Sequence, residues 1–245
     1  MRLLIINPNI SQSVTSLIEA EARLTADSDT TIMMATASSG VAYIETRFEA
    51  LLGGYAAAMI AGEQSGSYDA VLVAAFGDPG LSALKEVLDV PVVGMTEAAL
   101  MTAAQLGQRF SIIAISHRIT SWYRECVEQN GMLSRLASIR TLNNPLHDVG
   151  SIQQDHSELL LQLSQQAVQE DGADVLIMAG APLAGLSRTL AGKLTVPVVD
   201  GVSCGVSQAQ VLYKLNAGIA LEGSYARPPA KANKGLEQSL LALLR

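Results

Sequence analysis

Short β-branched apolar runs recur along the chain, separated by longer stretches of mixed polarity. In the first hundred residues, four of these runs predict buried strands, because apolar side chains point to both faces of each run. The predicted strands cover residues 3–6, 31–34, 70–75 and 91–93. Such buried runs are typical of parallel sheets covered on both faces.

Apolar residues at spacings of three and four predict helices between these strands. One helix is expected to begin near Ser11, a suitable N-cap, and to carry Val14, Leu17, Ile18 and Leu24. A second predicted helix carries a longer stripe of the kind that faces a core: Ile44, Phe48, Leu51, Leu52, Tyr55 and Met59. The alternation of strand and helix indicates an α/β fold with a parallel sheet.

The second half of the chain repeats the first. The segment from Asp69 resembles the segment from Asp174, with Gly80 and Gly185 offset by 185 − 80 = 105 residues. Further strands are therefore expected near 110, 137, 174 and 196. We predict two lobes with a ligand cleft between them, the first formed by residues 1–100 plus 205–245 and the second by 101–204. A helical stretch from about 205 to 245 should close the first lobe with one apolar face: Leu236, Leu240, Leu241 and Leu244.

Composition narrows the function classes. The chain has 245 residues, of which 49% are hydrophobic and 16% charged, so it can bury a substantial core. Its formal net charge of −7, with no basic run, argues against a nucleic-acid partner. No apolar run reaches about 18 residues and no signal peptide is recognisable, so no membrane association is expected and the localisation is predicted to be cytoplasmic. Two cysteines allow neither a disulfide framework nor a zinc site.

Small and polar residues gather where the predicted strands end. Ligands of open parallel sheets bind beyond the carboxyl ends of the strands, so these loops predict a small-molecule site. The same residues also suit ordinary turns, with Asp78 as a helix N-cap and Pro79 in the first turn. The predicted substrate-binding residues are Asn7, Ser39, Gly40, Tyr43, Phe76, Gly77, Ser116, His117, Arg118, Pro182 and Leu183.

Six segments together resemble the aspartate/glutamate/hydantoin racemases, and most closely the hydantoin and allantoin racemase branch. They are Ile6-Asn-Pro-Asn, Gly40-Val-Ala-Tyr-Ile-Glu, Phe76-Gly-Asp-Pro-Gly-Leu, Val93-Gly-Met-Thr-Glu-Ala-Ala, Phe110-Ser-Ile-Ile and Pro197-Val-Val-Asp-Gly-Val. The resemblance implies two pseudo-twofold-related flavodoxin-like lobes, each with a four-stranded parallel sheet. It also implies an isomerase that uses no cofactor or metal and forms a homo-oligomer. In this family a cysteine from each lobe flanks the stereocentre of the substrate.

The chain departs from that pattern at both catalytic positions. Where the resemblance places the two cysteines, this sequence has Ala75 and Ala181. A thiol and a thiolate can exchange a proton near neutral pH, whereas a methyl group has no proton to exchange. Two explanations stay open: deliberate replacement of both cysteines, or a natural branch that has lost or changed the chemistry.

Other titratable residues are weaker candidates. Cys204 follows Asp200-Gly-Val-Ser where a helix is expected to begin and a thiolate would be stabilised, but a small buried cysteine is the simpler explanation. His117 follows the fifth strand and could act as acid, base or hydrogen-bond partner. Packing, capping or loop roles suffice for the remaining ones: Cys126, His147, His156, Asp78 and Glu97.

The leading hypothesis is a racemase-family isomerase acting on a 5-substituted hydantoin or a similar cyclic ureide. An acidic amino acid would need a cationic clamp, for which Arg47 and Arg118 are the obvious candidates. Two alternatives stay open. One is a lyase or decarboxylase of the same superfamily, which needs a single proton donor, and the other is a catalytically silent small-molecule-binding protein.

Overall fold

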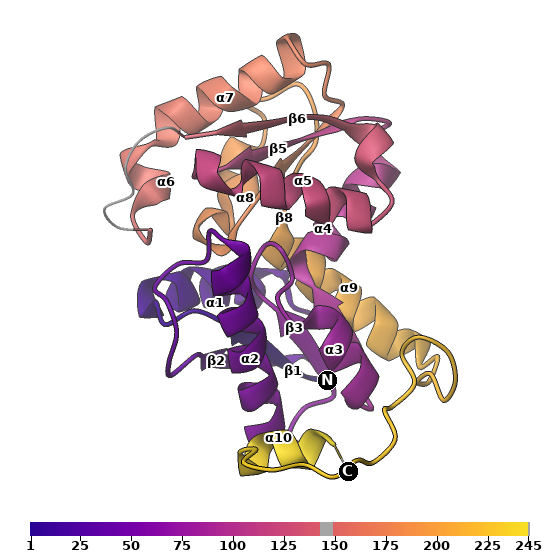
Figure 1. Ribbon diagram of the computed structural model, residues 1–245. Helices are drawn as coiled ribbons and strands as arrows, with labels where there is room; N and C mark the ends of the chain where they lie inside the picture. Colours follow the sequence, from indigo (N-terminus) through magenta and orange to yellow (C-terminus); the bar gives the residue numbers. More distant parts are fainter. Residues whose placement is uncertain (143–148, 245) are drawn as a thin grey trace.

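Two four-stranded parallel sheets form the centre of the computed structural model, which describes residues 1–142 and 149–244 (Figure 1). The first sheet has the order β2-β1-β3-β4 and the second the order β6-β5-β7-β8. Their strands are β1 (Arg2–Asn7), β2 (Thr31–Thr36), β3 (Ala70–Val73), β4 (Val92–Gly94), β5 (Phe110–Ala114), β6 (Leu136–Thr141), β7 (Val175–Met178) and β8 (Val198–Asp200). The predicted α/β class and the four-plus-four strand arrangement are confirmed.

The internal repeat is visible in the register of the two sheets. Val73 at the end of β3 pairs with Ile6, and Met178, which lies 105 residues later at the end of β7, pairs with Ile113. Past these strands, Gly80 and Gly185 both adopt a left-handed conformation, with φ of 78° and 77°, and both precede a helix. Glycine suits these turns because it has no Cβ to clash at positive φ.

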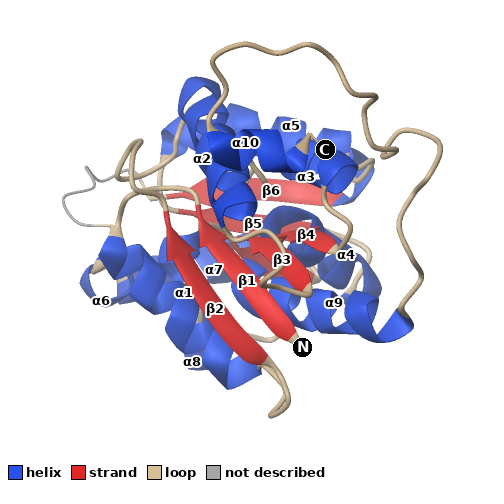
Figure 2. Ribbon diagram, turned by 90° about the horizontal axis from the view of Figure 1, so that it is seen from below, coloured by secondary structure: helices blue, strands red, loops and turns tan. Residues whose placement is uncertain are grey.

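Helices cover both faces of the sheets (Figure 2). Along the chain they are α1 (Gln12–Thr25), α2 (Arg47–Glu63), α3 (Leu81–Val87), α4 (Met95–Leu106), α5 (Thr120–Gln129), α6 (Ile152–Asp155), α7 (Ser157–Gln169), α8 (Leu186–Leu190), α9 (Gly201–Leu215) and α10 (Gln238–Leu243). The Ser11 side chain accepts a hydrogen bond from the Val14 amide, so the predicted N-cap of α1 is confirmed. Leu24, expected on the buried face of α1, is instead 70% exposed.

The buried face of α2 was predicted wrongly. Most of its large apolar side chains point outward, and its buried residues are mostly small: Gly53, Ala56, Ala57, Ile60, Ala61 and Gly62. Of these, Gly62 is covered by Ser239 of α10. A Cβ on Gly54 would lie 3.1 Å from the Gly80 amide nitrogen, so this side of the helix touches the turn that follows β3. Close approach of the helix to that turn requires small residues, which explains why the large ones face away.

The C-terminal segment is also not one helix. α9 ends at Leu215, its C-cap Asn216 adopts a left-handed conformation, and no helix forms again until α10. Three glycines and the Pro228-Pro229 pair fall in between and disfavour helix formation. Within α10, Leu243 is the buried residue, whereas Leu236 and Leu244 of the predicted face are exposed.

Two long helices connect the lobes. α4 packs against α9, and α9 in turn contacts β3 and β4 of the first sheet and β8 of the second. Both helices lie where the lobes meet in Figure 1. The proposed lobe boundaries at 100 and 205 stay a prediction. Across the described ranges 1–142 and 149–244, no helix has the length and apolar character needed to span a membrane.

Candidate functional site

The first half of the site is the loop that follows β3. The Ala74 amide still donates to the Ile6 carbonyl, so Ala75 is the first residue beyond the sheet. Gly77 then turns with φ of 102° and donates its amide to the Thr96 hydroxyl at 2.6 Å. A Cβ on Gly77 would lie 2.1 Å from the ring of Trp122, so the loop of the first lobe is pressed against α5 of the second.

The second half is the equivalent loop after β7. The Ala179 amide donates to the Ile113 carbonyl, Gly180 turns with φ of 100°, and Ala181 begins a short 3-10 helix, η3 (Ala181–Leu183). Backbone register therefore pairs Ala75 with Gly180, and Ala181 lies one residue further along. The Gln153 amide of α6 donates to the Pro182 carbonyl at 2.9 Å and to a second carbonyl of the loop, which holds the loop in place.

The Tyr123 side chain connects these two loops. Its ring centroid lies 4.5 Å from that of Phe76, and its hydroxyl lies 3.7 Å from the position of a Cβ on Gly180. Ala75, Phe76 and Ala181 are all buried in the cluster that contains Tyr123. The two loops therefore meet around one aromatic side chain.

Sequence reasoning missed Trp122 and Tyr123 as site residues. A signal was present, because two adjacent aromatics stand in the first turn of α5, shortly after the carboxyl end of β5. Sequence reasoning gives the nearby Cys126 a packing role and gives these two aromatics no role. Their partner across the site lies in the other lobe, which no local pattern reveals.

Tyr43 brings a hydroxyl to the same place. This oxygen is buried and faces the Tyr123 hydroxyl, but it forms no hydrogen bond of normal geometry with any described residue. Burial raises the pKa of Tyr43 well above its usual range, and the negative charge of Glu45 adds to this shift. The group is therefore a neutral donor, and an unsatisfied buried hydroxyl costs free energy unless a ligand or water binds it.

The other predicted binding residues have different surroundings. Asn7 is completely buried, and its amide nitrogen donates to Asn9, Ser11 and Thr15, so it is fully engaged within its own loop. Ser116 is a buried cap that accepts the Arg118 amide. Leu183 belongs to the core of the second lobe, whereas the remaining ones lie at the surface: Ser39, Gly40, His117 and Arg118.

The sequence suggested that Asp78 caps the helix that follows it, but it does not. Gly80 is the N-cap of α3, and the Asp78 carboxylate reaches across to α4, where it accepts the amides of Thr96 and Glu97 at 2.8 and 2.9 Å. Burial raises the pKa of Asp78 to about 7, although the two amides oppose this shift. The cap is non-local, and Asp78 itself has φ of 47°, which is unusual for a residue other than glycine. Glu97, expected to cap or anchor, accepts the Gly94 amide and pairs with Lys85.

With this geometry established, the chain can be compared with known proteins. Residues 3–209 match the family model described as Asp/Glu/Hydantoin racemase. The chain is 36% identical over 235 residues to a hydantoin racemase of Paenarthrobacter aurescens, which covers 94% of this chain and 99% of that protein. Two solved structures are also similar. An allantoin racemase from Klebsiella pneumoniae has a TM-score of 0.93 with 31% identity over 98% of both chains, and one from Pseudomonas fluorescens has a TM-score of 0.89 with 32% identity over 96% and 100%.

The chain belongs to the Asp/Glu/hydantoin racemase family. It is a racemase-type isomerase by family, and the resemblance drawn from the sequence motifs is confirmed. The comparisons do not test the assignment of cysteine positions to Ala75 and Ala181, which stays a prediction.

The two cysteines of this racemase-family chain are not activated. Burial raises the pKa of the Cys126 thiol to about 12 and that of Cys204 to about 11. Cys204 lies near the start of α9, but burial and the negative charge of Asp200 outweigh the hydrogen bonds from Thr102 and Ser203. His156 lies at the start of α7, and His147 falls outside the described residues.

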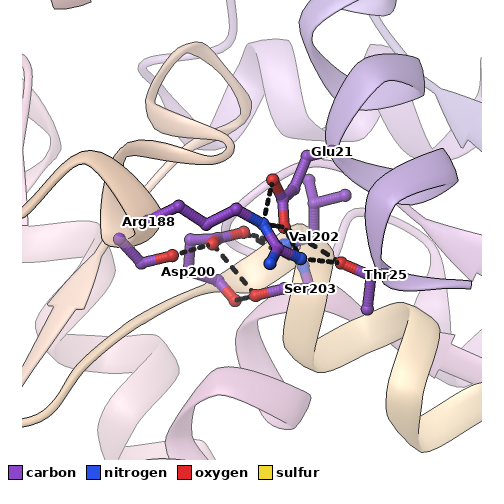
Figure 3. A network of polar contacts seen from close by, with 7 residues as sticks. Glu21, Thr25, Arg188, Asp200, Val202 and Ser203 are labelled. Carbon is purple, nitrogen blue, oxygen red and sulfur yellow. Dashed lines mark hydrogen bonds and ion pairs between the residues drawn. The ribbon is translucent and has the colours of Figure 1, made fainter. Parts of the chain in front are cut away.

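Polar contacts between the lobes fix the site loops relative to each other. Arg188 on α8 donates to Glu21 and Thr25 on α1, and the Glu21 side chain is 3% exposed (Figure 3). On the other side of the site, Arg47 forms an ion pair with Glu125 across the lobes, and Arg118 approaches Glu45 at 3.9 Å.

Proposed function

We propose that this racemase-family protein binds a 5-substituted hydantoin or a similar cyclic ureide where the Ala75 and Ala181 loops meet. The observation that carries the proposal is the convergence of both loops on Tyr123, with the unsatisfied Tyr43 hydroxyl beside them. A ureide ring presents carbonyl oxygens, and a neutral tyrosine hydroxyl can donate to one of them. The names of the similar proteins point to the same substrate class.

Charge at the site favours a neutral ring over an acidic amino acid. An α-carboxylate or side-chain carboxylate needs a cationic partner. The two arginines considered for this role, Arg47 and Arg118, are already directed toward Glu125 and Glu45. A ureide asks instead for neutral donors and acceptors, which Tyr43 and the loop backbone provide.

The chemistry we assign to this site is cofactor-independent proton transfer at the ring carbon that bears the substituent. A base on one face removes the proton, and an acid on the other face returns a different one, so the configuration inverts. Thiols at 75 and 181 would supply both groups, one as thiolate and one as thiol. With alanine at both positions, we propose that the chain keeps the binding site and lacks this racemisation.

The test restores the thiols. Ala75→Cys together with Ala181→Cys is expected to racemise an enantiopure 5-substituted hydantoin, measured as decay of its circular dichroism signal. In D₂O the same variant should incorporate deuterium at the ring carbon. Each single substitution is the matched control and should give no inversion, because one base serves one face.

Binding is measured separately, as a rise in the melting temperature of the unsubstituted chain with hydantoin. A rise in melting temperature without racemisation by the double variant would refute the catalytic positions and keep the substrate class. No rise would refute the substrate class itself. Racemisation by the unsubstituted chain would show that groups other than thiols do the chemistry, and the proposal would fail. A lyase or decarboxylase would release a product from the hydantoin rather than its enantiomer.

A further inference from the structure

The outward side of α2 carries four large apolar side chains that residues 1–142 and 149–244 leave exposed. Phe48, Leu51, Leu52 and Tyr55 are 68%, 68%, 37% and 53% exposed, and we call them the α2 stripe. They occupy positions i, i+3, i+4 and i+7, so they form one continuous row along the helix. Exposed apolar patches of this kind mark interaction sites in soluble proteins.

The equivalent helix of the second lobe lacks such a row. α7 connects the second and third strands of its sheet in chain order, as α2 does in the first lobe. The exposed positions of α7 are all polar: Ser157, Glu158, Gln162, Gln165, Gln166 and Gln169. Covering the outer side of a sheet therefore does not require an apolar exterior, and the α2 stripe has another cause.

The remaining part of the same side of α2 is already a helix-packing surface. Toward its C-terminal end, α10 lies across α2 (Figure 1). The Ser239 hydroxyl contacts the Met59 sulfur at 3.2 Å, and a Cβ on Gly62 would lie 2.1 Å from the Ser239 carbonyl oxygen. α10 stops short of the α2 stripe, so the outer side of α2 is covered by a helix over one half and open over the other.

The order of residues in the stripe indicates what covers the open half. Phe48, Leu51, Leu52 and Tyr55 follow the sequence aromatic, leucine, leucine, aromatic, with the same spacing from either end. We propose that the α2 stripe is the contact between two copies of this chain, whose α2 helices cross antiparallel about a twofold axis between Leu51 and Leu52. Phe48 of each copy then lies opposite Tyr55 of the other, as a self-complementary twofold interface requires.

The size of the stripe fits this contact. Taking roughly 200 Å² for each large side chain, its four residues expose roughly 450 Å² per copy. A stable interface buries roughly 800 Å² per partner, of which the apolar core is one part and a polar rim the rest. No charged residue stands within the row, so the apolar centre of the contact contains no pair of like charges.

The first test is the mass of the assembly in solution, measured by light scattering during size-exclusion chromatography. We expect Leu51→Glu to halve the mass of the wild-type particle, because it places two carboxylates at the axis. Leu24→Glu on α1 is the matched control, since Leu24 is 70% exposed and Leu51 68%, and it should leave the mass unchanged. Equal thermal unfolding of the two variants at low concentration verifies that both fold.

The second test is the register of the contact. Chains carrying Phe48→Cys are mixed with chains carrying Tyr55→Cys, and a short bismaleimide crosslinker is added. The antiparallel pairing predicts crosslinked mixed dimers and little crosslinking of either chain alone. Cys126 and Cys204 are buried, so the background is low.

Three outcomes overturn the proposal. They are a monomeric wild-type chain, an unchanged mass for Leu51→Glu, and loss of mass in both the Leu51→Glu and Leu24→Glu variants. Preferential crosslinking of the Phe48→Cys chain with itself would also overturn it, because that result indicates parallel helices.

Discussion

The two lobes solve one structural problem in different ways. A helix begins directly after the fourth strand of each sheet, and its first amides need acceptors. In the second lobe, Asp200 stands at the end of β8 and its carboxylate accepts the amides of Val202 and Ser203. In the first lobe Gly94 occupies the equivalent place, and the carboxylate comes from Asp78 in the neighbouring loop.

This difference ties the Ala75 loop to α4 directly through Asp78, whereas in the second lobe the link to the start of α9 runs through the Ser187 hydroxyl on α8. Asp78 and the Gly77 amide both bond to the first turn of α4, so the Ala75 loop is held through a titratable group. The Ala181 loop is held by the neutral amide of Gln153. Protonation of Asp78 therefore changes the hydrogen bonds that hold the Ala75 loop. We expect pH to alter the position of this loop more than that of the Ala181 loop.

The largest effect should come from placing an aspartate at position 94, as at Asp200 in the second lobe, while Asp78 still caps α4. A Cβ on Gly94 would lie 2.3 Å from the Asp78 carboxyl carbon, so Gly94→Asp forces two carboxylates into one place. We expect a loss of about 5 kcal/mol in the free energy of unfolding, from steric overlap and an unpaired buried charge, measured by urea denaturation.

The same substitution becomes tolerable when Asp78 is removed. Asp78→Gly frees the space, and glycine accepts the φ of 47° at that position. Gly94 has φ of −94° and ψ of 141°, an extended conformation like that of Asp200, so an aspartate there can cap α4. The double variant should regain most of the lost stability. If the stability losses of Asp78→Gly and Gly94→Asp simply add in the double variant, an aspartate at position 94 cannot cap α4 as Asp200 caps α9.

How much of this arrangement the sequence predicts depends on how local each interaction is. The strands and the Ser11 cap follow from neighbouring residues, and the repeat located both glycine turns. The target of Asp78 lies 18 and 19 residues away in sequence, so a rule for local capping assigned it to α3. Tyr123 was missed for the same reason, because its contacts with Phe76 and Gly180 cross between distant loops.

The orientation of α2 shows a second limit. Both sides of this helix are apolar, one with large residues and one with small ones. Burying the large side would remove more apolar surface from water, and periodicity alone favours that choice. The turn at Gly80 comes too close to α2 for large side chains, and a second copy of the chain would cover the exposed ones.

The next largest effect concerns pH and the carboxyl group that distinguishes the lobes. Because the folded pKa of Asp78 is raised from 3.8 to about 7, the native state binds more protons than the unfolded state between these values. The stability that Asp78 contributes is therefore greatest below pH 4 and falls as the pH rises to 7, by about 1.4 kcal/mol per pH unit where the fall is steepest.

Comparison with Asp78→Asn isolates this contribution, since asparagine tolerates positive φ and does not titrate. The unfolding free energy of the wild type minus that of the variant, measured from pH 4 to 8, should fall with rising pH and level off above pH 7. A constant difference would mean that the carboxyl group titrates alike in both states.

The smallest effect we predict separates the second-lobe cap from its first-lobe counterpart. The Ser187 hydroxyl donates to Asp200 Oδ2 at 2.6 Å, whereas Ser82, at the equivalent position 105 residues earlier, is exposed. Ser187→Ala should cost about 1 kcal/mol in the free energy of unfolding, because Ser203 still donates to the same oxygen at 2.9 Å. Ser82→Ala should stay within about 0.5 kcal/mol of wild type. Both are measured by urea denaturation at pH 8, where Asp78 does not contribute a slope. Equal losses at the two serines would indicate that the hydrogen bond from Ser187 does not support the Asp200 cap. The caps of α4 and α9 would then differ only in where the capping aspartate stands in the sequence.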